Sequence, residues 1–185
     1  MLHIISGKYK GFKLYPVPSP KTRSTSHLLR KILFDTIGSL VQDSIVLDLF
    51  SGSGACGFEA LSRSAKEIYL VDNFYLSFRI MKKNKMKLKL NENEAHIFYG
   101  DAFQMLKKFI QKNIFFDLII IDPPYFSDFY LLLFQYLNQV TSEEALVAVE
   151  THYKTLLSNE IENFVLFKIK ISGNKKITFY KKNFF

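Results

Sequence analysis

The sequence predicts an α/β domain built on a mainly parallel, seven-stranded sheet with an antiparallel C-terminal hairpin, preceded by a small arm of β-hairpin and helix. Beyond residue 42, short apolar runs alternate with helical patterns, which is typical of a parallel sheet covered on both faces. The last two apolar runs are joined by Ser172–Lys175 alone, and so short a connection requires an antiparallel pair. We therefore divide the chain into an arm, residues 1–40, and a main domain, residues 41–185.

Three successive patterns predict the arm. Residues 2–15 alternate loosely between apolar and polar side chains and break at Gly7 and Gly11, as a short β-hairpin does. Proline at positions 16, 18 and 20 then predicts a stiff, extended connector. From Ser26 the apolar residues fall on one helical face, so we expect a helix that Ser26 caps and Gly38 ends.

The main domain begins with a predicted βαβ unit. Ile45–Phe50 is a short apolar run typical of a buried strand, and glycines separate it from a helical segment at Phe58–Arg63 and a second strand at Ile68–Val71. Helices are expected between the first four of the remaining strands. Those strands are predicted at Ala95–Tyr99, Phe116–Ile121, Ala145–Glu150, Phe164–Ile171 and Lys176–Lys181.

Positive charge favours a polyanionic partner. The chain has 25 basic and 17 acidic residues, a net charge of +8 and a pI near 9.4, and neutralised phosphates supply much of the affinity for nucleic acid. Nucleotide bias in the genome is the alternative explanation of the total. The arm is more specific, because it interleaves basic residues with Tyr9, Phe12 and Tyr15, a mixture that suits phosphate contact and base stacking. The candidate nucleic-acid contacts are Lys10, Arg23 and Arg30.

Other classes of function are disfavoured. No apolar stretch approaches the roughly 20 residues of a membrane helix, and the N-terminus lacks a basic region followed by an apolar one, so we expect a cytoplasmic protein. Cys56 is the single cysteine, which excludes an internal disulfide; we interpret it as a small packing residue. The four histidines lack the spacing of metal ligands, and no metal is expected.

A glycine-rich loop follows the first strand of the main domain. Glycines there let the backbone turn sharply and approach a ligand closely. The spacing of Gly52, Gly54 and Gly57 matches G-x-G-x-x-G, which alone indicates only a nucleotide-like cofactor. Asp48, inside the strand, would repel a pyrophosphate but suits a cationic amino-acid group. The loop therefore favours S-adenosylmethionine over a dinucleotide.

Two further acids end the next two strands. Asp72 stands where a carboxylate accepts from both ribose hydroxyls, and Asp101 can face the adenine amino group. The alternative is that such acids only cap helices. The predicted cofactor contacts are Asp48, Phe50, Ser51, Gly52, Ser53, Gly54, Asp72, Asp101 and Ala102.

The segment Asp122-Pro123-Pro124-Tyr125 is the predicted catalytic centre. It follows a buried strand, so it lies at the same edge of the sheet as the glycine loop. A base amine has its lone pair delocalised, and methyl transfer to it needs acceptors for its N–H groups. The Asp122 carboxylate and the carbonyl of Pro123, which the second proline holds in place, are such acceptors, and Tyr125 can stack on an extruded base.

Motifs along almost the whole chain match one known family. They are Ile4–Gly7, Gly11, Leu14, Arg23, Thr25, Arg30, Leu33, Phe34, Leu47–Arg63, Asp122–Tyr125, Glu150 and Gly173. In these residues the chain resembles the RsmD family of 16S ribosomal RNA guanine-N2 methyltransferases, which have the Rossmann-like class I methyltransferase fold. Three arm positions depart from that family's usual residues: Ser24, His27 and Lys31.

The resemblance implies a function in rRNA processing. The expected reaction transfers a methyl group from S-adenosylmethionine to the exocyclic amine of a guanine, nucleotide 966 of 16S ribosomal RNA, and the arm helps to grip the RNA or the small subunit. A monomer is expected. Two alternatives stay open: an adenine-N6 nucleic-acid methyltransferase, since the Asp-Pro-Pro-Tyr motif does not fix the base, and a non-catalytic RNA-binding assembly factor with the same fold.

Overall fold

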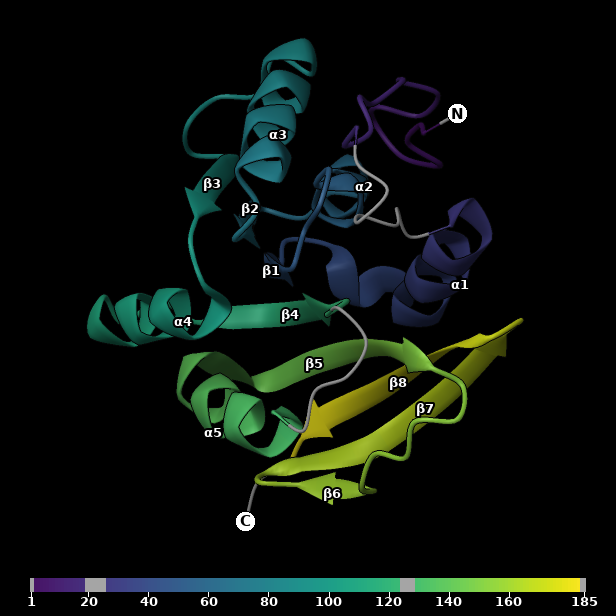
Figure 1. Cartoon of the computed structure of the whole chain (residues 1–185), viewed down its shortest axis with the longest axis vertical. Helices are drawn as coiled ribbons and strands as arrows, with labels where there is room; N and C mark the ends of the chain where they lie inside the picture. The colour runs from purple at the N-terminus through teal and green to yellow at the C-terminus, as the bar shows by residue number, and fades with distance from the viewer. Residues whose placement is uncertain (1, 19–25, 124–128, 184–185) are drawn as a thin grey trace.

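A computed structural model describes residues 2–18, 26–123 and 129–183 (Figure 1). Within that part of the chain, no helix has the length and apolar character needed to cross a bilayer. The elements are α1 (His27–Ile37), the 3-10 helix η1 (Gly38–Val41), β1 (Ile45–Leu49), α2 (Ala55–Ser62), β2 (Glu67–Asp72), α3 (Tyr75–Lys87), β3 (Ala95–Tyr99), α4 (Ala102–Gln111), β4 (Phe116–Ile121), α5 (Tyr130–Val140), β5 (Thr141–His152), β6 (Glu160–Ile161), β7 (Phe164–Ser172) and β8 (Lys175–Lys182).

The described strands form one sheet in the order β3-β2-β1-β4-β5-β8-β7-β6. The pairs from β3 to β5 are parallel, and β8 joins β5 and β7 in antiparallel fashion. Alternate residues of β4 enter two different cores: Leu118 and Ile120 pack with α1, α2 and α3, while Ile119 and Ile121 pack with α4 and α5. This confirms the mainly parallel sheet, covered on both faces, with a C-terminal hairpin (Figure 1).

The sheet differs from the prediction at its C-terminal edge. The short strand β6 makes the described sheet eight-stranded instead of seven-stranded. The helix expected before Phe164 is wrong, because residues 153–163, all of them described, contain turns and β6. Side chains of β8 hold this segment extended: Lys176 Nζ donates to the carbonyl of Thr155, and the Tyr180 hydroxyl donates to that of Ser158 at 2.7 Å.

The arm packs into the core of the main domain. Its hairpin is present only as an isolated bridge between His3 and Lys13, supported by backbone bonds such as that from the N–H of Leu14 to the carbonyl of Leu2 (2.9 Å). The predicted helix is confirmed as α1, with the Ser26 hydroxyl accepting from the N–H of Leu29 and Gly38 at the C-cap. The division at residue 40 stays a prediction, since Leu29 shares one hydrophobic cluster with residues of the sheet.

The α2 helix fastens the arm through main-chain atoms. The fully buried Glu59 carboxylate accepts from the N–H groups of Ile5 (2.7 Å) and Ser6 (3.1 Å) and from Arg63 Nε (2.8 Å). One turn further, the N–H of Tyr9 donates to the Ser62 hydroxyl at 2.9 Å. The arm therefore docks by its backbone.

Asn84 of α3 joins the arm to the glycine loop. Its amide oxygen accepts from the N–H of Tyr15 at 2.7 Å, and its amide nitrogen donates to the carbonyls of Tyr15 (3.1 Å) and Ser53 (3.0 Å). Asn84 is fully buried. A single side chain thus fixes the spacing between the end of the arm and the loop.

Arg30 corrects one prediction. We expected it to contact nucleic acid, but its side chain is 0% exposed. Its guanidinium donates to the carbonyl of His3 at 2.5 Å and to that of Ala55 at 3.5 Å, and Nε lies 3.9 Å from Glu59. Arg30 therefore stabilises the arm from within, and no phosphate reaches it in this conformation.

Gly57 allows α2 to lie close to β2. A Cβ atom on Gly57 would be 2.2 Å from Cδ2 of Leu70, whereas on Gly100 the nearest atoms, in Met105, would be 3.4 Å away. We expect Gly57→Ala to lower the free energy of unfolding in urea by about 1–3 kcal/mol, the usual effect of overpacking. Gly100→Ala is the matched control, and equal losses in the two variants would contradict this account.

Candidate active site

The glycine loop follows β1 and is fixed to the neighbouring strand. Ser51 and Val71 exchange two hydrogen bonds, one through the Ser51 hydroxyl (3.0 Å) and one between backbone atoms (2.9 Å). The N–H of Gly52 donates to Asp72 Oδ2 at 2.8 Å. Gly52 has φ +56°, and a Cβ there would meet nothing within 4 Å. The loop is thus held rigidly while its backbone stays open to a ligand.

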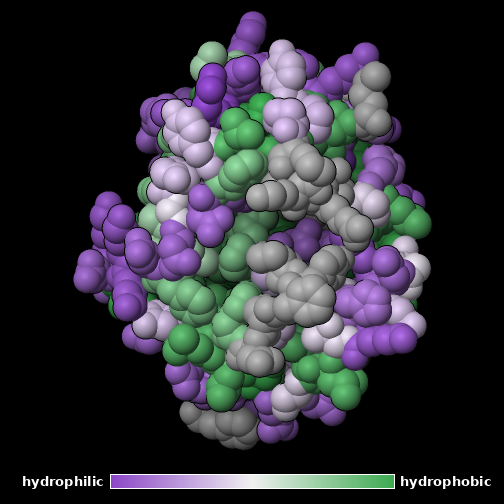
Figure 2. Space-filling view, in the orientation of Figure 1, coloured by the Kyte–Doolittle hydropathy of each residue, from purple (hydrophilic) through white to green (hydrophobic). Residues whose placement is uncertain are grey.

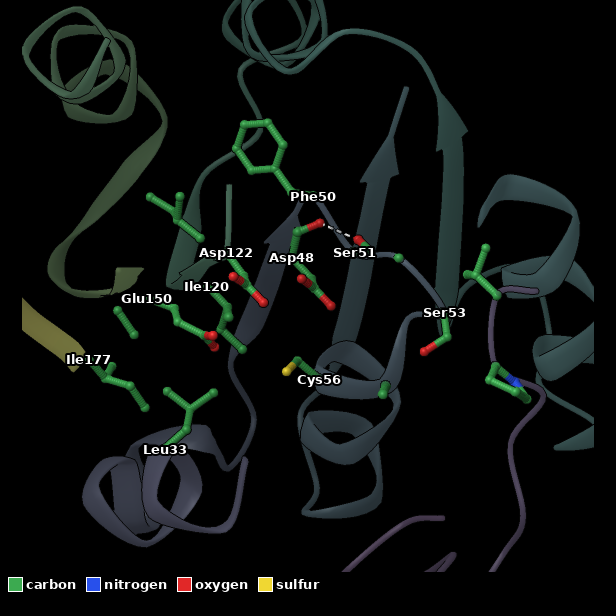
Figure 3. A pocket seen from close by; sticks show the side chains of 16 residues that line it. Leu33, Asp48, Phe50, Ser51, Ser53, Cys56, Ile120, Asp122, Glu150 and Ile177 are labelled. Carbon is green, nitrogen blue, oxygen red and sulfur yellow. Dashed lines mark hydrogen bonds between the residues drawn. The ribbon is translucent and has the colours of Figure 1, made fainter. Parts of the chain in front are cut away.

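A cleft of about 730 Å³, part of it open to solvent, lies beside this loop. Figure 2 shows a hollow near the middle of the face drawn, with hydrophilic surface inside it. In the close view, the carboxyl groups of Asp48, Asp122 and Glu150 approach one another (Figure 3). The cleft is lined by Pro16, Val17, Leu33, Asp48, Phe50, Ser51, Gly52, Ser53, Ala55, Cys56, Ile120, Ile121, Asp122, Ala148, Glu150 and Ile177.

Asp48 is buried in the floor of the cleft. Its side chain accepts from the N–H of Gly57 at 3.0 Å, and the residue is 3% exposed. Burial raises the pKa of Asp48 to about 8, and the charges of Asp122 and Asp72 act in the same direction. A cation in the cleft would relieve this cost, because an opposite charge nearby favours the ionised form.

Glu150 connects Asp122 to β8. It lies in the buried part of β5, and its neighbour Val149 is paired with Ile121, so Glu150 and Asp122 stand next to each other in register. A side-chain hydrogen bond links the two, and Lys175 Nζ donates to Oε1 of Glu150. Burial, and then the charge of Asp122, raise the pKa of Glu150 to about 7, although Lys175 opposes the rise.

The structure brings together most of the predicted loop residues and separates others from the cleft. Asp48, Phe50, Ser51, Gly52, Ser53 and Asp122 line the cleft, whereas Gly54, Asp72, Asp101, Ala102 and Pro123 are not among its lining residues. The Asp101 side chain caps α4, accepting from the N–H groups of Phe103 (3.0 Å) and Gln104 (3.1 Å). The predictions for Pro124, Tyr125 and Arg23 fall outside the described residues.

Sequence reasoning gave no role in the site to several residues that line the cleft. Pro16 and Val17 of the connector and Leu33 of α1 are among its lining residues, so the arm contributes to the site. Glu150 and its partner Lys175 were also missed as site residues. Glu150 carried a signal, since, like Asp122, it is an acid at the end of an apolar run.

The raised pKa of Asp48 predicts a pH-dependent stability. The ordinary value is 3.8 and the folded value is about 8, so ionisation costs the folded state and the free energy of unfolding falls as the pH rises between these values. Each pKa unit corresponds to about 1.4 kcal/mol. Glu150 contributes in the same direction. We expect Asp48→Asn to flatten part of the fall in urea titrations from pH 5 to pH 8, whereas the exposed control Asp35→Asn leaves it unchanged; equal curves for both variants would contradict the shift.

Comparisons with known proteins agree with this geometry. The model of the family "conserved hypothetical protein 95" matches residues 2–181. Ribosomal RNA small subunit methyltransferase D of Haemophilus influenzae is 32% identical over 93% of this chain and 89% of its own; that of Escherichia coli is 31% identical over 98% and 90%. The solved structure of Escherichia coli yhhF superposes with a TM-score of 0.85 at 30% identity, over 98% of this chain and 97% of the other. The chain therefore belongs to the conserved hypothetical protein 95 family, together with the ribosomal RNA small subunit methyltransferases D.

Proposed function

We propose that this protein is an S-adenosylmethionine-dependent ribosomal RNA methyltransferase that modifies the N2 amine of a guanine in the small subunit, nucleotide 966 of 16S ribosomal RNA. The observation that carries the proposal is the cleft in which the glycine loop and the Asp122 carboxylate meet (Figure 3). The relatives named ribosomal RNA small subunit methyltransferase D support the substrate class.

The residues of the cleft fit S-adenosylmethionine. This cofactor supplies an electrophilic methyl group and carries positive charge, which the buried carboxylate of Asp48 would stabilise. A pyrophosphate would be repelled by the same carboxylate. Asp72 holds the loop through Gly52, and a carboxylate has further lone pairs with which it would accept ribose hydroxyls. Asp101 would act at the adenine end from its place at the start of α4.

Asp122 would act on the methyl acceptor. Its carboxylate accepts an N–H of the base amine, which favours a pyramidal nitrogen while the new carbon–nitrogen bond forms and the carbon–sulfur bond breaks. The surplus proton of the methylated amine then leaves to a carboxylate of the cleft or to water. The partial burial of Asp122 strengthens this interaction, because the effective dielectric constant is lower away from water.

The arm supplies a surface for RNA. Phe12 and Tyr15 are 45% and 47% exposed, Lys87 Nζ lies 4.7 Å from the ring centre of Tyr15, and Lys8 Nζ lies 5.0 Å from that of Tyr9. The predicted contact Lys10 is exposed in the same region. Such groups provide stacking and phosphate contacts together.

The test is a methyl-transfer assay with labelled S-adenosylmethionine on small ribosomal subunits that lack the modification, followed by nucleoside digestion and chromatography. N2-methylguanosine is expected. If N6-methyladenosine is formed instead, the proposed methyl-transfer chemistry stands and the substrate base is adenine. Cofactor binding without label in the RNA would overturn the enzymatic proposal in favour of a non-catalytic assembly factor.

A further inference from the structure

Three polar side chains from neighbouring strands form a row, of which Asp122 and Glu150 line the cleft and Lys175 lies behind Glu150. Asp122 follows β4, Glu150 lies on β5, and Lys175 begins β8. Glu150 is the middle member, since it is hydrogen-bonded to Asp122 and paired with Lys175. The side chains of Glu150 and Lys175 are 7% and 16% exposed, so water has little access to the pair. The row offers two hydrogen-bond acceptors followed by one donor.

The Watson–Crick edge of guanine presents the complementary order. Its N2 and N1 atoms carry hydrogen-bond donors, and O6 is an acceptor. With the N2 amine at Asp122, where the chemistry takes place, N1–H falls next to Glu150 and O6 next to Lys175. Enzymes that act on an extruded base read this edge by hydrogen bonds. The two guanine donors would replace the hydrogen bond between Asp122 and Glu150, and the proton of that bond would pass to water, which leaves both carboxylates as acceptors.

Adenine would fit the row poorly. Its amino group at Asp122 places N1, an acceptor, against the Glu150 carboxylate, and the adenine ring offers Lys175 no acceptor of its own beside that carboxylate. A site whose buried polar groups are left unpaired by a wrong substrate rejects that substrate strongly. The row thus separates the two bases by repelling adenine N1 as well as by attracting guanine.

We propose that Glu150 and Lys175 select guanine by binding N1–H and O6 of the extruded base, a role that rests on the proposed guanine-N2 activity. Asp122 holds the reacting amine, and the pair beside it determines which base places an amine there. Neither residue transfers a proton to or from the reacting nitrogen in this role.

The test compares two substrates for each variant. Wild-type protein first identifies the methylated nucleotide in unmodified small subunits, and subunits with adenine at that nucleotide form the second substrate. The variants are Glu150→Gln, Lys175→Met and the control Glu143→Gln, an exposed acid on the same strand. For each we would measure kcat/KM on both substrates, the methylated nucleoside formed, the melting temperature and the affinity for S-adenosylmethionine.

Glu150→Gln is expected to lower kcat/KM for the guanine substrate by roughly 10- to 100-fold, the usual discrimination lost with a base contact. It should also lower the ratio of kcat/KM for guanine to kcat/KM for adenine, because an amide can donate to adenine N1. Lys175→Met should narrow the ratio too, and Glu143→Gln should match wild type. An unchanged ratio in both Glu150→Gln and Lys175→Met, or equal losses on both bases, would overturn the inference while the proposed function stands. If wild-type protein forms no N2-methylguanosine, the proposed function itself fails and the inference falls with it.

Discussion

Asp122→Ala is expected to lower kcat for methyl transfer by about 10²- to 10³-fold, the effect of removing one preorganised hydrogen-bonding group from a transition state. The affinity for S-adenosylmethionine should stay near the wild-type value, because Asp48 and the loop residues remain in the cleft. Single-turnover kinetics on unmodified subunits would measure the first quantity, and thermal shift with the cofactor would measure the second.

Asp72→Ala provides the contrasting variant. Asp72 lies beside the glycine loop and accepts from the N–H groups of Gly52 and Phe74, both at 2.8 Å. Its loss should therefore weaken the binding of S-adenosylmethionine and leave the site of the methyl acceptor intact. A fully active Asp122→Ala variant would refute the role of Asp122. A further signature is electrostatic: without the Asp122 charge, the pKa values of Asp48 and Glu150 should both fall.

Glu59→Ala should have the largest effect on stability. The substitution removes the acceptor of two arm N–H groups. It also leaves the positive charge of the fully buried Arg30 without the carboxylate that balances it. Breaking a buried pair in this way costs about 3–5 kcal/mol. In a chain of this length each kcal/mol corresponds to roughly 2–4 °C in Tm, so calorimetry should find a fall of the order of 10 °C.

The control is Glu144→Ala, which removes an exposed carboxylate from β5. Surface substitutions of this kind change stability by no more than about 0.5 kcal/mol. Hydrogen exchange at the N–H groups of Ile5 and Ser6 would show whether the loss is local. Equal stabilities of the two variants would contradict the account of the arm.

The sequence was informative about the main domain because its signals are local. The strand candidates are runs of buried apolar residues, and the glycine loop follows one of them directly, so both could be placed from spacing alone. Asp48 and Asp122 could be predicted for the same reason, since Asp48 lies inside such a run just before the glycine loop and Asp122 directly follows another. The weakest pattern belongs to β6, which has two residues and pairs with β7 alone.

The interactions of the arm are not local, and they were missed. Arg30 in a basic segment resembles a phosphate contact, yet it lies on the face of α1 that contains Leu33, Phe34 and Ile37. That spacing was available in the sequence. Its partner Glu59 could not be identified, because the contact joins residues far apart in the chain and depends on how α2 packs against the arm.

The hydrogen bonds that Glu59, Ser62 and Asn84 make to residues 5–15 all end on main-chain atoms of the arm. Such anchoring does not depend on the side chains that face outward. The outward-facing residues Lys8, Lys10 and Phe12 can therefore be exchanged without loosening the attachment, and this segment is suited to divergence between relatives or to grafting by design. In a relative whose arm carries different outward-facing side chains, Glu59, Ser62 and Asn84 would hold that arm against the cleft in the same way.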